Sequence, residues 1–157
     1  MVDVTGKPPT ARRAVARCLL VVGESTRRDL IADASRPGGE LLAEARTAGQ
    51  MAGKRTADLL PLCHPLLLGD ITVDFSIVSQ GILVVAGVDA LDRTGVEMEA
   101  LTTCTVAALT IYAAYKSADP TMVVTDATVL EKSGGRSGSW RLTSAGVVVN
   151  NPVDGSV

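Results

Sequence analysis

The chain has 157 residues, and its 15 basic and 17 acidic side chains give a formal net charge of −2. This length predicts a single domain with an ordinary core, so a larger assembly has to be built from copies of the chain. Aromatic residues make up only 3% of the sequence. The balanced charge and the few rings argue against a nucleic-acid-binding surface, which needs clustered cations and stacking platforms. A compact anionic ligand is compatible with this composition.

Neither a membrane span nor a disulfide framework is expected. No apolar run reaches the roughly 18 residues that a membrane span requires, and the first residues lack the basic and apolar regions of a signal peptide. The cysteines, Cys18, Cys63 and Cys104, form no Cys-x-x-Cys pair, and His64 is the single histidine. We therefore expect a cytoplasmic protein with no disulfide, no zinc site and no other protein-bound metal.

The first third of the chain predicts a strand, a short helix and a loop. Residues 14–22 are apolar and end in a β-rich run, which is typical of a buried strand. A short helix is expected to open at 25–31, with Ser25 as its N-cap. The Ser-Arg-Pro-Gly-Gly run at 35–39 predicts a loop.

A long helix and a hairpin are expected next. From Glu40 onward, small and apolar residues recur at helical spacing, and Pro61 is expected to end this helix. Residues 71–77 alternate between apolar and polar side chains, which predicts a half-buried strand. A Gln-Gly turn then leads into a second β-rich run at 82–88.

The remaining elements complete an α+β pattern. A second long helix is expected at 95–116, a last strand at 122–130 and a glycine-rich loop at 132–138. Residues 139–157 are expected to form a C-terminal tail that is partly disordered, since turn-forming residues dominate its end. The order of elements predicts one domain at 1–138, in which helices pack on one face of an antiparallel sheet.

His64 lies between two prolines, in the run Leu-Pro-Leu-Cys-His-Pro at 60–65. A residue that precedes proline is pushed out of the α region, so this segment is expected to be stiff and extended. Such a mount suits an imidazole that contacts a ligand. A structural histidine that bonds a nearby carbonyl group explains the sequence equally well.

Charged groups mark both ends of the second long helix. Glu97 and Glu99 lie at its start, about 200° apart on a helical wheel, so they straddle the helix entry rather than share a face. Lys116 lies at its end and has the chemistry to transfer a proton or bind phosphate. The simpler interpretation of all three is that they complement the helix dipole.

The run Lys-Ser-Gly-Gly-Arg-Ser-Gly at 132–138 combines two cations with backbone N–H groups that no Cβ crowds. Such a loop can cradle an anion. It lacks the residue order of a Walker loop, and a plain connector is the alternative. Lys54 and Arg55, near the end of the first long helix, are likewise typical of a solvated face.

The length of the second long helix sets a condition on any site that uses both of its ends. From Met98 to Lys116 the helix would span about 27 Å at ~1.5 Å per residue. No small ligand touches both ends of one such helix. If both ends are functional, a neighbouring subunit has to supply one of them, and a symmetric oligomer is then required.

Several motifs together resemble one known family, that of the cyclic pyranopterin monophosphate synthases (molybdenum cofactor biosynthesis protein C). The resemblance covers the chain up to about Gly138. The motifs that carry it are Met1-Val2-Asp3-Val4, Lys54-Arg55-Thr56, Leu60-Pro61-Leu62-Cys63-His64-Pro65, Gly95-Val96-Glu97-Met98-Glu99-Ala100-Leu101 and Lys132-Ser133-Gly134-Gly135-Arg136-Ser137-Gly138.

The resemblance implies a ferredoxin-like α+β subunit, a hexamer built as a trimer of dimers, and active sites at the subunit interfaces. The reaction implied is a lyase step that converts 3′,8-cyclo-7,8-dihydroguanosine 5′-triphosphate into cyclic pyranopterin monophosphate and diphosphate. No resident cofactor is implied, although Mg²⁺ is compatible with the triphosphate. A polyanionic substrate that rearranges needs clustered cations and groups that transfer protons.

The resemblance also implies roles for individual residues. Asp3, Lys7 and Arg12 match the substrate-contacting N-terminal segment, and Lys116 matches the catalytic lysine, which acts across the subunit interface. The binding pocket is matched by Lys54, Leu62, Cys63, His64, Glu97, Met98, Glu99 and Lys132.

Two positions depart from the family's pattern. Ala113 occupies the position of the catalytic aspartate, and Gly38 that of a substrate-contacting lysine. The sequence therefore leaves more than one interpretation open. The first is a lyase of this family; the alternative is a catalytically impaired paralogue that binds a nucleotide or pterin or co-assembles with an active synthase. A plain oligomeric scaffold without a ligand is the third.

Overall fold

The structure, a computed structural model, describes residues 1–35, 39–135 and 138–150. Its elements are β1 (Thr10–Val21), α1 (Glu24–Ala34), α2 (Glu40–Gly53), α3 (Thr56–Leu59), β2 (Leu68–Val78), β3 (Gly81–Asp92), α4 (Glu97–Tyr115), β4 (Val123–Ser133), β5 (Ser139–Thr143) and β6 (Gly146–Asn150).

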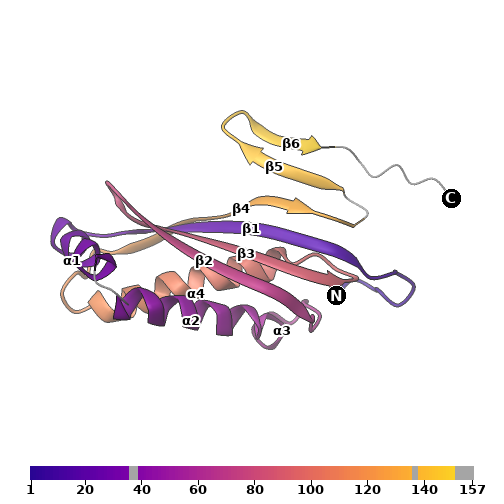
Figure 1. Cartoon of the computed structure of the whole chain (residues 1–157), viewed down its shortest axis with the longest axis horizontal. Helices are drawn as coiled ribbons and strands as arrows, with labels where there is room; N and C mark the ends of the chain where they lie inside the picture. Colours follow the sequence, from indigo (N-terminus) through magenta and orange to yellow (C-terminus); the bar gives the residue numbers. More distant parts are fainter. Residues whose placement is uncertain (36–38, 136–137, 151–157) are drawn as a thin grey trace.

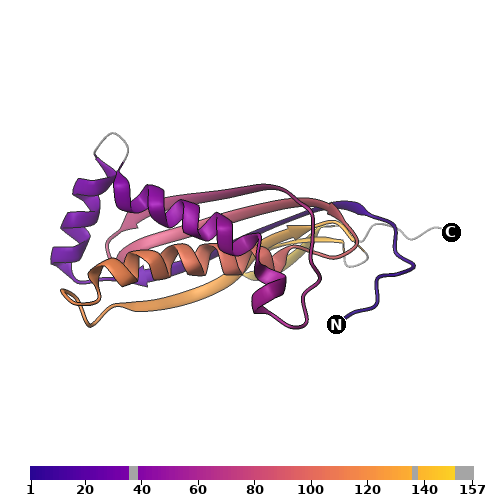
Figure 2. The same ribbon diagram turned by 90° about the horizontal axis from the view of Figure 1, so that it is seen from below.

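The strands form one antiparallel sheet in the order β2-β3-β1-β4-β5-β6. The two long helices, α2 and α4, lie side by side on one face of this sheet (Figures 1 and 2). The order β2-β3-β1-β4 with helices on one face is the ferredoxin-like arrangement. The expected α+β fold is therefore confirmed, and so is the second long helix at nearly the predicted bounds.

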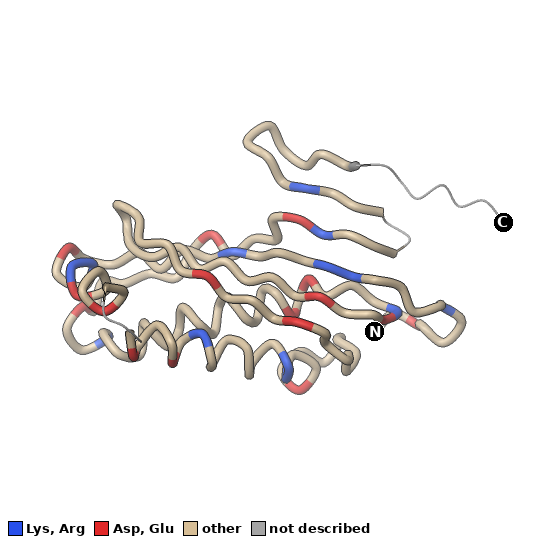
Figure 3. The backbone as a smooth tube through the Cα atoms, in the orientation of Figure 1, with Lys and Arg blue, Asp and Glu red and all other residues tan. Residues whose placement is uncertain are grey.

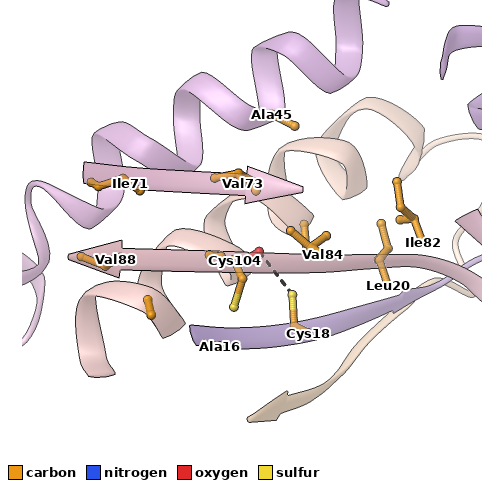
Figure 4. Packing of buried hydrophobic residues seen from close by; sticks show 14 of the residues in the cluster. Ala16, Cys18, Leu20, Ala45, Ile71, Val73, Ile82, Val84, Val88 and Cys104 are labelled. Atoms are coloured by element: carbon orange, nitrogen blue, oxygen red, sulfur yellow. Dashed lines mark hydrogen bonds between the residues drawn. The ribbon is translucent and has the colours of Figure 1, made fainter. Parts of the chain in front are cut away.

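Small aliphatic side chains fill the space between sheet and helices (Figure 4). Alternate residues of β1 are completely buried, and Ala16, Cys18 and Leu20 point toward the helices. The Cys18 thiol donates a hydrogen bond to the carbonyl oxygen of Cys104 on α4, at 3.2 Å. The side chain of Cys104 and, after it, burial raise the pKa of Cys18, so its thiol remains protonated and serves packing.

Charged residues of both signs are interspersed along the trace (Figure 3). Within the described residues, ion pairs link Arg13 to Asp89 across β1 and β3 and Arg141 to Glu131 across β5 and β4. No helix in the described part of the chain combines the length and the apolar character that crossing a bilayer takes.

The expected N-cap of the first helix is wrong. α1 begins at Glu24, with Gly23 at the cap position, so Ser25 lies inside the helix. Asp119 supplies the missing cap from beyond the far end of α4. Its carboxylate accepts hydrogen bonds from the Gly23 backbone N–H at 2.7 Å and from the Thr26 hydroxyl at 3.0 Å. These bonds, that from Gly23 above all, lower the pKa of Asp119.

The first long helix ends earlier than predicted. α2 stops at Gly53, and the four-residue helix α3 follows before Pro61. The Arg55 N–H bonds the Ala52 carbonyl group, which tightens the last turn, and the Thr56 hydroxyl donates to the Gly53 carbonyl oxygen at 3.0 Å. These local bonds redirect the chain, and Pro61 ends α3 instead.

The C-terminal expectations also need correction. β4 continues to Ser133, so Lys132 belongs to a strand and not to the predicted loop at 132–138. Residues 139–150, which belong to the expected C-terminal tail, form the hairpin of β5 and β6. Residues 151–157 lie outside the described residues.

The close approach of α2 and α4 gives a test of the packing. A Cβ atom at Gly49 of α2 would lie 2.7 Å from the backbone oxygen of Thr103 and 3.1 Å from the Cβ of Ala107, both on α4. We expect Gly49→Ala to lower the free energy of unfolding by about 1–2 kcal/mol, because overpacking outweighs the gain in helix propensity. Urea unfolding measures this change.

The matched control is Gly6→Ala. A Cβ at Gly6 meets nothing within 4 Å, so its free energy of unfolding should change by less than about 0.5 kcal/mol. Equal effects of the two substitutions would contradict the described helix packing.

Candidate active site

Two of the sequence motifs meet at one end of the molecule. A cavity of about 170 Å³ is lined by Leu62, Cys63 and His64 from the loop after α3 and by Met98 and Glu99 from the first turns of α4. The same end holds α3 and the N-terminus of the chain (Figure 2). The fold thus places the only imidazole beside a buried carboxylate.

A smaller cavity of about 80 Å³ adjoins the first and adds two cations. His64 and Glu99 line both cavities, and Lys54 and Arg55 line the second. Lys54 is the C-cap of α2. Because α2 ends at Gly53 and not at Pro61, Lys54 lies at the helix end that borders this cavity. The two cavities together combine two carboxylates, from Glu99 and Asp58, with an imidazole and two cations.

Glu97 and Glu99 take different surroundings, as their angular separation predicts. Glu97 accepts a hydrogen bond from the Lys132 ammonium group at 2.6 Å, and the two side chains are only 27% and 16% exposed. Glu99, by contrast, is 4% exposed and borders the cavities. The ion pair ties the start of α4 to the end of β4. Lys132 lines neither of these cavities, but the Glu97 carboxylate that holds it lies against Gly95, which lines the cavity beside His64.

The N-terminal segment contributes a carboxylate at the same end. Both the backbone N–H and the hydroxyl group of Thr5 donate to Asp3, at 2.9 and 2.8 Å. These bonds lower the pKa of Asp3, and the nearby Lys7 and His64 lower it further. Asp3 is therefore ionised at neutral pH and close enough to His64 to act on it electrostatically.

Basic residues gather in a third cavity of about 360 Å³, lined by Lys7, Arg12 and Arg93. It shares Val2, Thr94 and Gly95 with the cavity beside His64. Arg12 is held in place because its guanidinium group donates to the carbonyl oxygens of Asp92 and Arg93, each at 3.2 Å. The three cations make this cavity suited to an anion with several charges.

Arg55 and Arg93 were missed by the sequence reasoning as site residues. Arg93 precedes the Gly-Val-Glu-Met-Glu motif by two positions, and that proximity was the available signal. Gly135 also lines the third cavity. Its φ of +81° is in the left-handed region that favours glycine, and a Cβ there would overlap the Arg12 guanidinium group.

Burial controls the protonation of the groups in the first cavity. Loss of solvent raises the pKa of Glu99 to about 6, and the negative charge of Glu97 adds to this effect. Burial and the Glu99 carboxylate likewise raise the pKa of Cys63. The Cys63 thiol therefore stays neutral near pH 7, whereas Glu99 can release and regain a proton close to that pH.

Lys116 does not join the other predicted site residues. It is the C-cap of α4, and it is exposed, as is Ala113 one turn earlier. The structure places this end of α4 beside α1, at the opposite end of the molecule from the cavities (Figure 2). Gly38, the second position that departs from the family's pattern, lies outside the described residues.

The described residues contain no group of three or more His, Cys, Asp or Glu side chains placed to hold a metal ion.

Comparison with known proteins agrees with this arrangement. A model of the MoaC family matches residues 1–135. The chain belongs to the MoaC family. Similar proteins include cyclic pyranopterin monophosphate synthase 2 of Mycobacterium tuberculosis (strain ATCC 25618 / H37Rv), which is 49% identical over 140 residues, 89% of this chain and 83% of the relative.

Other relatives of this MoaC-family chain carry the same name. The cyclic pyranopterin monophosphate synthase of Novosphingobium aromaticivorans is 48% identical over 141 residues, which are 90% of this chain and 89% of the relative. That of Corynebacterium glutamicum (strain R) is 47% identical over 140 residues, 89% of each chain. The resemblance predicted from the motifs is therefore confirmed at the level of the family.

The raised pKa of Glu99 makes stability depend on pH with a defined sign. The folded chain binds this proton more tightly than the unfolded chain, so stability falls as pH rises from about 4.5 to about 6. Above pH 6 the loss levels off at about 2 kcal/mol. We expect Glu99→Gln to remove this loss: its free energy of unfolding should exceed that of the wild type at pH 7.5 and match it near pH 4.

Urea unfolding at several pH values, with a constant protein concentration, measures this difference. The control is Glu97→Gln, which should be less stable than the wild type at pH 7.5, because it breaks the ion pair with Lys132. A difference between Glu99→Gln and the wild type that is the same at every pH would rule out a perturbed Glu99.

Proposed function

We propose that this chain is a cyclic pyranopterin monophosphate synthase, a lyase of molybdenum cofactor biosynthesis. It converts 3′,8-cyclo-7,8-dihydroguanosine 5′-triphosphate into cyclic pyranopterin monophosphate and releases diphosphate. The observation that carries the proposal is the meeting of His64, Glu99 and Lys54 in adjoining cavities. Membership of the MoaC family and the names of the relatives support it.

The proposed substrate matches the charge distribution of the site. Its triphosphate carries several negative charges, and Lys7, Arg12 and Arg93 line the largest of the three cavities. Fixed cations stabilise the negative charge that develops on a departing diphosphate. The ring system of the substrate would then occupy the cavity that His64 and Glu99 border.

Proton transfer is the second requirement of the rearrangement. Glu99 has a pKa of about 6, which allows it to act as either an acid or a base near neutral pH. His64 is the neighbouring group that can accept or donate a proton. Cys63, as a neutral thiol, and Leu62 and Met98, as apolar side chains, shape the wall of the cavity.

The remaining catalytic group comes from another copy of the chain. Lys116 is separated from Glu99 by nearly the whole of α4, about 25 Å at ~1.5 Å per residue. We propose a homo-oligomer, a hexamer built as a trimer of dimers, in which the exposed Lys116 of one subunit completes the cavity of the next. Such sharing gives every copy of the site the same composition.

The impaired-paralogue alternative rests on Ala113 and Gly38, since a methyl group cannot transfer a proton. The proposed lyase instead assigns proton transfer to Lys116, Glu99 and His64. Nothing in the comparisons favours the alternative. In the proposed reaction Mg²⁺ accompanies the triphosphate as part of the substrate, no resident cofactor takes part, and the cytoplasm is the compartment.

The proposed activity predicts diphosphate release from the cyclised substrate. We expect the wild-type chain to release diphosphate, and Lys116→Ala to lower kcat by at least about 100-fold, the usual effect of removing a general acid or base. A coupled diphosphate assay measures both rates. Ala113→Asp is the matched variant: an active wild type supports the lyase, whereas activity that appears only in Ala113→Asp would support the impaired paralogue.

The shared site predicts complementation between two inactive variants. Lys116→Ala and His64→Ala, unfolded and refolded together, should recover up to about a quarter of wild-type activity, since random pairing rebuilds one intact site in half of the two-subunit pairs. Each variant refolded alone serves as the control and should stay inactive. A mixture that is also inactive, while native mass shows mixed oligomers, would place the whole site within one subunit.

A further inference from the structure

The C-terminal hairpin lies outside the segment that the family model matches, yet it pairs with Lys132, which is hydrogen-bonded to Glu97 at the start of α4. The match ends at residue 135, whereas β5 and β6 occupy residues 139–150 and extend the sheet beyond β4 (Figure 1). The ladder between β4 and β5 consists of two pairs, Glu131 with Arg141 and Lys132 with Trp140. The second pair includes a residue of the site.

Trp140 is the large neighbour of Lys132 on the helix-covered face. Directly opposite residues of antiparallel strands point to the same face, with Cβ atoms about 4.5–5.5 Å apart. On the other side of β4, Lys132 pairs with Ala14 of β1, which carries only a methyl group. Lys132 reaches Glu97 from this face, and its neighbours in the sheet are a small residue on one side and a tryptophan on the other.

The burial of Lys132 is consistent with cover from the hairpin. Its side chain is only 16% exposed, although it lies one residue from the end of β4. Trp140 is itself partly buried, and with Ser139 and Lys132 it lines a cavity of about 170 Å³. Without the hairpin, β4 would be the edge of the sheet, and water would reach the ion pair between Lys132 and Glu97. Exposure to water weakens such a pair.

We infer that Trp140 is a positioning residue, which holds the Lys132 side chain against the sheet so that its ammonium group stays on Glu97 beside the anion-binding cavity. The inference rests on the proposed function for what Lys132 then does. An ammonium group has three N–H donors, and Glu97 takes one of them. The others remain for a phosphate oxygen of the substrate. The hairpin thereby becomes part of the active site.

The first test needs no substrate. A double-mutant cycle with Glu97→Gln and Lys132→Met, followed by urea unfolding, measures the coupling between these two side chains. We expect Trp140→Leu to reduce this coupling by about half or more. Trp140→Phe, which keeps a ring, should retain it. Val148→Thr is the matched control, since Val148 pairs with Arg141 and therefore points to the opposite face of the hairpin. Coupling that survives intact in Trp140→Leu would overturn the inference.

The second test reads the same effect in catalysis. Trp140→Leu should raise KM about fivefold and change kcat less, because a displaced Lys132 weakens the binding of the anionic substrate. In a Lys132→Met background the same substitution should add no further change. If Trp140→Leu raises KM as much in the Lys132→Met background as in the wild type, Trp140 does not act through Lys132. If the wild type shows no turnover, only the proposed function is contradicted. The double-mutant cycle measured by urea unfolding still decides the role of Trp140.

Discussion

The rigid length of α4 is the constraint on which the rest of the account depends. This helix runs from Glu97 to Tyr115 without interruption, and a regular helix of that size keeps its two ends more than 25 Å apart, at ~1.5 Å per residue. Its first turns border the cavities, and its C-terminal cap carries Lys116. Packing against α2 and the sheet prevents the helix from bending to close that distance. A site that needs both ends therefore has to be assembled from two molecules.

At the N-terminal end of α4, burial of an acidic side chain lowers the stability of the folded chain at neutral pH. Glu99 lies at the base of the cavities, where the loss of water raises its pKa into the range useful for proton transfer. Lys54 and Arg55 border the same space, and the basic cavity lined by Arg12 adjoins it. A ligand with several negative charges and a reacting ring fits this pair of sites, with the charges in the basic cavity and the ring beside Glu99. The neighbouring Glu97 serves a different purpose, because it anchors Lys132.

Local patterns in the sequence predicted most of the fold, and long-range contacts account for the differences. Alternation and β-rich composition were sufficient for the hairpin, and an Ala-, Thr- and Leu-rich composition for the long helix at 95–116, because each signal lies within one segment. Ser25 looked like an N-cap, but Asp119 caps α1 from more than 90 positions away. The motifs identified the loop residues of the site together with Glu99. The ion pair between Glu97 and Lys132 and the hairpin of β5 and β6 depend on strand pairing, which no local pattern shows.

A crystal structure of the Lys116→Ala variant with the unconverted cyclic triphosphate bound would test the central claim most directly. The account predicts that the substrate lies between His64 and Glu99 of one subunit and the C-terminal end of α4 of another, with residue 116 of that second subunit facing the ring system. A substrate that contacts a single subunit, with every copy of residue 116 remote from it, would contradict the claim.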